Sequence, residues 1–188
     1  MKKVHCVVVL AVLLTASTVG LALAAEKAPQ RVQDLATSKL VQLAKNPVII
    51  AAVRAENAKG KSLAEIKERQ KKWAATPGVD SFMKSLMEND CAKALFDIQK
   101  EYPYLVEIFV KDNQGAHVAM TDKTTWYYHG DKDKFIKAFN GGRGALYLSD
   151  VQFDESSQAY LVQVSVPVMD GKSCIGVVIF GVDVDKFK

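Results

Sequence analysis

The sequence predicts an α+β protein in which the helices come first along the chain and the strands follow. Apolar residues recur every three or four positions in the first half, as in amphipathic helices, and alternate or run continuously in the second half, as in strands. The period changes at Tyr102-Pro103. Since a block of helices followed by a block of strands usually packs as separate layers, we expect long N-terminal helices packed on an antiparallel sheet of five strands.

Residues 1–24 have the pattern of a secretory signal peptide. Lys2 and Lys3 precede an apolar run at residues 7–14, and the small residues around Ala24 and Ala25 suit cleavage there. A membrane anchor would need about 20 strongly apolar residues, and polar residues dilute the second half of this segment. We therefore expect a cleaved signal peptide, export to the periplasm, no stable membrane insertion, and a single mature domain over residues 25–188.

Charge and cysteine content limit which partners and which chemistry we expect of the mature chain. Cleavage would remove Lys2 and Lys3 and so lower the formal net charge of +4 by two, and the remaining basic residues are mostly scattered. This balance indicates no nucleic-acid partner. Cys91 and Cys174 are the cysteines of the mature chain. In an oxidising compartment they either form a disulfide or remain two buried thiols, and the sequence leaves both open.

The helical part, about residues 30–101, carries clear start signals. Residues 31–44 have apolar positions at helical spacing. Ser62 to Glu65 match the capping box, in which the hydroxyl and the carboxylate each satisfy one free backbone N–H. The other starts are marked by a capping side chain or a proline in the first turn: Asn46-Pro47, Asp80, and Asn89 or Asp90. We expect a helix after each signal.

The sheet part, about residues 104–185, begins with a predicted hairpin. Two β-rich runs, at residues 105–111 and 116–120, flank the turn at residues 112–115. A short helix is expected at residues 132–139, followed by a glycine-containing turn. Three further strands are expected after it, separated by polar turns: residues 145–153, 159–168 and 174–184.

Several segments stand in a distinctive order: EIFVKDNQGAHVAM with its D-x-x-G turn, the aromatic stretch TDKTTWYYHGDKDKF, and the strand sequences YLSDVQF, VSVPV and IGVVIFGVDV. In this order they resemble the extracytoplasmic sensor domains called Cache or PDC domains, in particular a stand-alone periplasmic group behind a signal peptide. The resemblance implies a PAS-like antiparallel sheet of five strands. One face would be backed by the long N-terminal helix. The other would be roofed by the connection after the second strand, where the family binds small ligands.

Trp126, Tyr127 and Tyr128 are the leading candidates for this ligand site. Aromatic rings provide apolar walls, and those of Trp and Tyr also carry a hydrogen-bonding group. In an extended segment Trp126 and Tyr128 would face one way and Tyr127 the other. Two interpretations remain open, because the rings either contact a ligand or only fasten a long loop onto the sheet.

The strand at residues 159–168 adds candidates through its alternation. Tyr160, Val162, Val164 and Val166 should face the backing helix, and Gln163 and Ser165 the roof, where they either bind the ligand or meet solvent. The remaining candidates stand near the ends of the roof connection: Asp131, Arg143, Tyr147 and Asp150. An arginine suits a carboxylate through two parallel hydrogen bonds, and an aspartate suits an amine. Arg143 is otherwise a surface residue, and Asp150 otherwise caps a turn.

Catalytic and metal-binding patterns are weak in this sequence. His117 and His129 are the histidines of the mature chain, and no nucleophile motif accompanies them. The alternating His129, Asp131 and Asp133 lack the full ligand pattern of a calcium or zinc site. We expect no enzymatic activity, no metal and no cofactor.

Together these features predict a periplasmic sensor module that binds a small organic acid, an amino acid or an amine. Because the sequence ends at Lys188, directly after the last strand, we expect the signal to pass by contact with a separate membrane receptor. The alternative is an interaction or assembly protein with the same fold and no functional pocket. A filled roofed face would favour this alternative, whereas a cavity lined by rings and polar groups would favour ligand binding.

Overall fold

The computed structural model describes residues 26–155 and 157–188, and the predicted signal peptide lies outside them. The chain begins with one continuous helix, in which α1 (Gln30–Leu35) and α2 (Val41–Leu43) are joined by a π-helical turn (Ala36–Leu40). The backbone stays right-handed helical through both junctions. The helix predicted at residues 31–44 is confirmed.

Four more helices follow at the predicted start signals: α3 (Pro47–Ala58), α4 (Leu63–Ala75), α5 (Ser81–Glu88) and α6 (Asp90–Glu101). Asn46, Asp80 and Asn89 each cap a helix through a side-chain oxygen. Ser62 and Glu65 form both hydrogen bonds of the predicted capping box. A cap of this kind stabilises a helix by about 1 kcal/mol because it satisfies backbone N–H groups that otherwise lack a partner.

The sheet is antiparallel and has the order β2-β1-β6-β5-β3, with β4 also paired to β5. Its strands are β1 (Leu105–Lys111), β2 (His117–Met120), β3 (Tyr147–Leu148), β4 (Gln152–Asp154), β5 (Ala159–Asp170) and β6 (Ser173–Asp183). Helix α7 (Asp133–Phe139) and a 3₁₀ turn (Asn140–Gly142) lie in the connection between β2 and β3. The predicted α+β class is therefore confirmed.

The strand predicted at residues 145–153 is wrong as one piece, because it forms the two short strands β3 and β4. The backbone N–H of Gln163 donates to the Ser149 hydroxyl at 2.9 Å, a side-chain acceptor in place of a backbone carbonyl. The backbone N–H of Val151 donates to the carbonyl of Glu26 at 2.7 Å. Since these bonds leave the sheet ladder, pairing with β5 is interrupted between the two strands.

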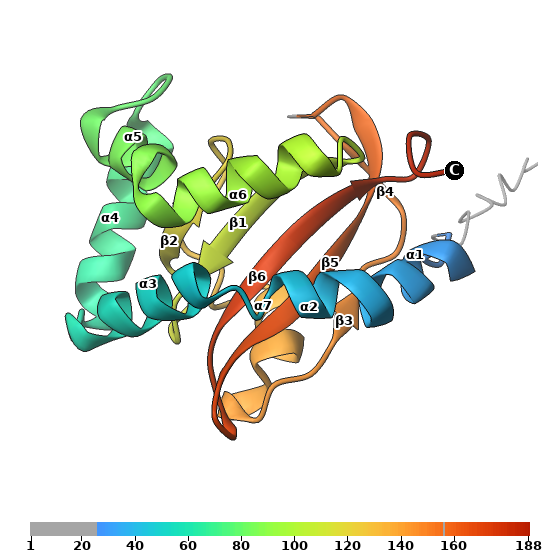
Figure 1. The fold of residues 1–188 in the computed structure, drawn as a ribbon. Helices are drawn as coiled ribbons and strands as arrows, with labels where there is room; N and C mark the ends of the chain where they lie inside the picture. The colour runs from blue at the N-terminus through green and yellow to red at the C-terminus, as the bar shows by residue number, and fades with distance from the viewer. Residues whose placement is uncertain (1–25, 156) are drawn as a thin grey trace, which may run out of the picture.

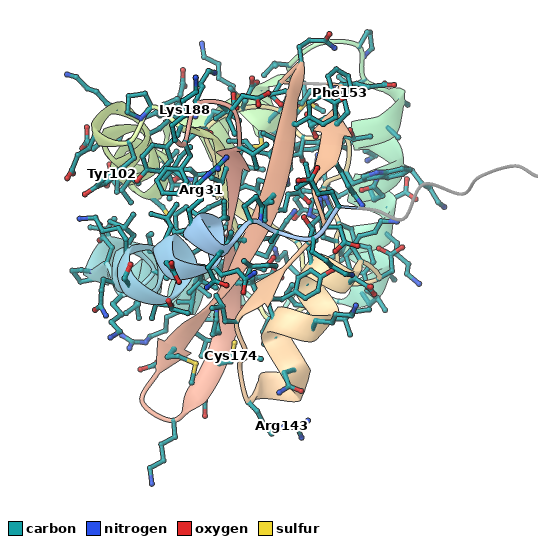
Figure 2. The ribbon with its side chains drawn as sticks, turned by 90° about the vertical axis from the view of Figure 1, so that its right-hand side faces the viewer. Arg31, Tyr102, Arg143, Phe153, Cys174 and Lys188 are labelled. Carbon is teal, nitrogen blue, oxygen red and sulfur yellow. The ribbon has the colours of Figure 1, made fainter. Side chains whose placement is uncertain are left out.

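The sheet separates two hydrophobic cores. On one face, Val162, Val164 and Val166 of β5 pack with residues of α1, α3 and α6. On the other face, Phe109 and Ile179 pack with residues of α4, α5 and α7. Figures 1 and 2 show this layering, with α1–α3 and α6 on one side of the sheet and α4 and α7 on the other. The predicted facing of the β5 valines toward the backing helices is confirmed.

Helix α4 belongs to the roofed side of the sheet, although it lies within the helical half of the sequence. Its Ile66 and Trp73 are buried in the second core beside Phe109 and Tyr127. Burial of each large apolar side chain contributes about 1.5–3 kcal/mol. Helix α4 therefore forms a fixed wall against the roof connection.

Both cysteines of the described residues are free and buried. The interpretation of Cys91 and Cys174 as two buried thiols is confirmed, and their pairing is not. Among residues 26–155 and 157–188, no helix has the length and apolar character needed to cross a bilayer.

Candidate functional site

A polar row crosses the roofed face of the sheet on three neighbouring strands. Glu107 of β1 and Gln163 of β5 both pair with Gly181 of β6. A Cβ atom at Gly181 would collide with the Glu107 side chain. Because glycine leaves this space open, Gln163 Nε2 reaches across the strand and donates to Glu107 Oε1 at 2.7 Å.

A cavity of about 150 Å³ lies above this row, beneath the connection between β2 and α7. For scale, one water occupies about 30 Å³ in the liquid. The cavity walls combine aromatic rings with charged and polar groups: Glu107, Phe109, Thr124, Thr125, Trp126, His129, Lys134, Asp154 and Gln163. A second cavity of about 140 Å³ adjoins it and shares Lys134, Asp154 and Gln163.

Both signs of charge meet in this space. Lys134 Nζ donates to Gln163 Oε1 at 2.9 Å, so Gln163 joins the amine of Lys134 to the carboxyl group of Glu107. Burial raises the pKa of Glu107, while the bond from Gln163 and the charge of Lys134 oppose the shift. Burial also lowers the pKa of Lys134, against the attraction of Glu107 and Asp154. The cavity therefore places the amine of Lys134 beside two carboxyl groups, and burial disfavours the charged forms of Lys134 and Glu107.

The segment that covers the cavity, residues 121–130, is here called the roof segment. Thr124 holds it to α4 and β2, because its carbonyl accepts a bond from Trp73 Nε1 at 2.9 Å and its Oγ1 lies 2.7 Å from His117 Nε2. The Thr124 hydroxyl donates its hydrogen to the carbonyl of Trp126. His117 must therefore donate through Nε2, which leaves its Nδ1 as an acceptor.

Two glycines let the far end of the roof segment rest on the β1–β2 turn. Gly115 has φ of +88°, and a Cβ atom there would come within 2.5 Å of the backbone nitrogen of Gly130. The N–H of His129 donates to the carbonyl of Gly115 at 2.8 Å. Side chains at either glycine would block this approach, so the D-x-x-G turn has a structural reason to end in glycine.

Basic groups are buried directly beneath the roof segment. Lys111 is fully buried, and its Nζ donates to the carbonyl of Tyr127 at 3.1 Å. Burial, and then the charge of Lys111, lowers the pKa of both His117 and His129 well below the usual histidine value. Nδ1 of each histidine is buried and has no hydrogen-bond partner among the described residues. His129 is also among the residues that line the cavity.

The three rings of the aromatic stretch have different environments. Trp126 is 45% exposed and lines the cavity. Tyr127 is 3% exposed, and its ring packs against Trp73 and Phe82 in the second core. Tyr128 is partly buried, and its backbone N–H donates to Gln70 Oε1. One ring thus borders the cavity, and Tyr127 fastens the segment to the core.

Of the other sequence candidates, Gln163 lines the cavity and the rest do not. Ser165, two residues after Gln163 in β5, is fully buried, and its hydroxyl has no partner among the described residues. Tyr147 lies under Lys137, whose Nζ is 4.9 Å from the ring centre. Asp150 pairs with Lys27 at 3.0 Å, and exposed Asp131 pairs with Lys132 at 3.4 Å.

Arg143 is placed at a distance from the cavity. It is exposed in the glycine turn, where it donates to Asn140 Oδ1 at 3.0 Å. Figure 2 shows it at one end of the molecule, with Phe153 at the opposite end. Phe153 lines the second cavity.

Glu107 and Lys134 are cavity residues that were not among the sequence candidates. A usable signal for Glu107 is present in LVEIFVK, where a charged residue interrupts an apolar strand. The two-residue period of a strand places Glu107 on the same face as Phe109 and Lys111. Lys134 carries no comparable signal, because KDKFIKAF is typical of any amphipathic surface helix.

The histidine and aspartates considered for a metal differ in their exposure to solvent. His129 is buried, whereas Asp131 and Asp133 are exposed. Across residues 26–155 and 157–188, no group of three or more histidine, cysteine, aspartate or glutamate side chains is arranged to hold a metal ion.

Comparisons with known proteins find similarity in structure only. No protein-family model matches the sequence, and no curated protein matches it. The sensor domain of the V. cholerae histidine kinase DctB is 10% identical, with a TM-score of 0.45 over 84% of this chain and 55% of that one. The sensory domain of the Campylobacter jejuni chemoreceptor Tlp3, solved with isoleucine bound, is 14% identical, with a TM-score of 0.43 over 84% of this chain and 63% of that one.

The extracellular domain of a histidine kinase designated rpHK1S-Z16 is 16% identical, with a TM-score of 0.40 over 82% of this chain and 57% of that one. The chain thus spans about 55–63% of the length of these solved domains. They are described as the sensor, sensory and extracellular domains of histidine kinases and a chemoreceptor. At these identities the similarity concerns the fold and carries no information about ligand or partner.

Proposed function

We propose that the protein is a periplasmic sensor module without enzymatic activity, which binds a small polar organic molecule and signals by contact with a separate membrane receptor. The observation that carries the proposal is the cavity between the roof segment and the sheet, where Trp126 lies beside Lys134, Glu107 and Gln163. An apolar wall with a few convergent polar groups is the usual composition of a small-molecule site. A filled roofed face would have supported the interaction or assembly alternative instead.

The charges in the cavity support a ligand that is an organic acid, an amino acid or an amine. Lys134 suits a carboxylate, and Glu107 with Asp154 suits an amine. Amino acids carry both groups, so they are the first class to test. The volume of about 150 Å³ favours a small molecule over a peptide.

A thermal-shift screen of the purified mature protein against these three classes tests the proposal. A ligand present at one hundred times its dissociation constant stabilises the folded state by about 2.7 kcal/mol. For a chain of this length, that free energy raises the melting temperature by about 5–10 °C. Absence of a shift with all three classes would contradict ligand binding.

A pair of variants then separates cavity binding from binding elsewhere. Gln163→Leu removes the group that joins Lys134 to Glu107, and we expect it to weaken ligand binding at least tenfold, measured by titration calorimetry. Arg143→Ala is the matched control, because Arg143 is a sequence candidate that lies outside the cavity lining. An equal loss of affinity in both variants, or a loss only in Arg143→Ala, would show that the ligand binds outside the cavity.

A further inference from the structure

A larger hollow lies on the helical face of the molecule, opposite the roof segment. A groove of about 660 Å³ runs between α3 and the start of α6, and a hollow of about 450 Å³ lies between the start of α3 and the remainder of α6. Pro47 lines both. Figure 1 shows α6 and the α2–α3 pair side by side over the same face of the sheet. We name this combined surface the α3–α6 groove.

The dimensions of the α3–α6 groove match one helix. Helix α6 has 12 residues, which at 1.5 Å per residue give a groove length of about 18 Å, or three helical turns. Its walls carry Ala51, Ala52 and Ala94, and its floor includes Val118 and Cys91. Small side chains on both walls let another helix approach closely, and recognition of an amphipathic helix by an apolar groove is a recurrent mode of binding.

The charge of the rim indicates which kind of helix fits. Helix α6 contributes Asp90, Asp97 and Glu101 to the lining. Asp97 and Glu101 form no ion pair within residues 26–155 and 157–188, whereas Asp90 pairs with Lys93 at 2.8 Å. The opposite wall carries two lysines: Lys45, which donates to Gln42 Oε1 at 3.1 Å, and Lys59, which is paired with Glu56 at 2.7 Å. The lining thus holds four carboxylates, three of them on α6, against two lysines, and the excess negative charge lies on the α6 wall.

We propose that the α3–α6 groove is the docking site for a basic amphipathic helix of a partner protein. The apolar side of that helix packs against the alanines of α3 and α6, and its lysine or arginine residues face Asp97 and Glu101. This inference rests on the proposed function, because the groove would be the surface through which the module contacts its receptor. The groove lies on the other side of the sheet from the proposed ligand cavity. Its test needs no ligand, so failure of either proposal is seen separately.

The test uses a fluorescent 18-residue peptide of leucine, alanine and lysine in an amphipathic helical pattern, titrated with the purified mature protein and followed by fluorescence anisotropy. A matched peptide carries glutamate in place of every lysine. We expect saturable binding of the lysine peptide, weakened by added salt, and at least tenfold weaker binding of the glutamate peptide. Equal binding of the two peptides, or binding of neither, overturns the proposal.

Variants locate the binding to the groove. Ala51→Trp fills it from an exposed position of α3, and we expect at least a tenfold loss of affinity. The double variant Asp97→Asn with Glu101→Gln keeps the shape and removes charge, and we expect a three- to tenfold loss that disappears in high salt. Ala74→Trp is the control, on an exposed position of α4 outside the groove, and should bind as the unmodified protein does.

Two outcomes of these variants contradict the proposal. Unchanged affinity in Ala51→Trp, with the variant folded by circular dichroism, would place the peptide elsewhere. Concentration-dependent self-association of the protein that Ala51→Trp abolishes would identify a second copy of the chain as the occupant, and would replace the partner helix.

Discussion

Trp126 and Tyr127 are neighbours in the sequence but differ in what holds them. The Tyr127 ring lies 5.6 Å from the rings of both Trp73 and Phe82, inside the second core. Trp126 is 45% exposed at the cavity, with Lys132 Nζ 5.1 Å from its ring centre. The same extended backbone turns alternate side chains to opposite sides, so one ring serves the core and the next borders the proposed ligand site.

Alanine substitutions should separate these two roles. Tyr127→Ala should lower the free energy of unfolding by about 3–5 kcal/mol, because it removes a buried aromatic ring. Trp126→Ala should cost about 1 kcal/mol or less, since much of the ring already meets water, while weakening binding of a ligand found by the screen. Denaturant unfolding and titration calorimetry measure the two effects. Equal losses of stability in the two variants would show that both rings are scaffold.

The buried histidines give the protein a defined response to acid. Burial holds the pKa of His117 and His129 in the folded protein below the unfolded value of about 6.5. As the pH falls, the unfolded chain therefore binds protons first. Above about pH 7 the two histidines are neutral in both states, so their titration does not affect the free energy of unfolding. As the pH drops through 6.5, their titration lowers it. The slope is at most about 1.4 kcal/mol per pH unit for each histidine.

Glu107 acts in the opposite direction, because burial raises its pKa in the folded protein and acid relieves that cost. Substitution of a histidine separates the histidine contribution to this pH dependence from that of Glu107. We expect His129→Asn to reduce the loss of unfolding free energy between pH 6.5 and 5.5 by about 1 kcal/mol, as measured by denaturant unfolding at each pH. The same slope in the variant and the unmodified protein would mean that His129 binds its proton as readily in the folded protein as in the unfolded chain.

At the scale of elements, the roof segment and the β1–β2 turn depend on each other. The turn carries Gly115 at φ +88°, and the carbonyl of Gly115 accepts the N–H of His129 at 2.8 Å. Trp73 and His117 hold the segment at its other end through Thr124. These contacts join α4, β2 and the turn around the cavity. Movement of the roof segment would therefore disturb its hydrogen bond to α4.

Two glycine variants test this contact against simple backbone strain. Gly60 also has positive φ, at +62°, but a Cβ atom there meets nothing within 4 Å. Gly60→Ala should cost about 1–2 kcal/mol for a left-handed alanine. Gly115→Ala should cost clearly more, because its Cβ also meets the backbone of Gly130. Denaturant unfolding compares the two, and similar costs would argue against close packing of the roof segment on the turn.

At the scale of the whole molecule, one sheet serves two separate surfaces. The helical face carries the α3–α6 groove, and the roofed face carries the cavity proposed to bind a ligand. β5 and β6 pair along most of their length and contribute side chains to both cores. The two proposed binding surfaces therefore share the strands β5 and β6 as their support.

Thiol counting checks the state of the whole chain. Burial raises the pKa of the Cys91 thiol to about 12, so neither it nor the buried Cys174 should react quickly in the native protein. Denatured, unreduced protein purified from the periplasm should show two thiols per chain by titration. A count of zero would mean that a disulfide forms between them. Three thiols would mean that Cys6, and with it the predicted signal peptide, is retained.

Local chemistry made much of the fold predictable. Caps at Asn46, Ser62 and Asp80 act within three residues of the side chain that provides them, so the sequence identifies them without knowledge of distant contacts. The alternation in β5 likewise placed its valines on one core and Gln163 on the opposite face. The break between β3 and β4 was not predictable, because it depends on Ser149 and Val151 bonding outside the ladder.

The candidate site was predictable only in part, for the same reason. Sequence reasoning found the aromatic stretch and Gln163, and it proposed Arg143 and Asp150, which the fold places in a distant turn and beside Lys27. Glu107 meets Gln163 across β6 only because Gly181 lies between them, and Lys134 reaches the same place from a helix. The sequence by itself determined the order and type of the elements, which arise from short-range periodicity and capping. Only the tertiary structure decided which charged side chains share one cavity, because strand register and the packing of α7 bring together residues that are far apart along the chain.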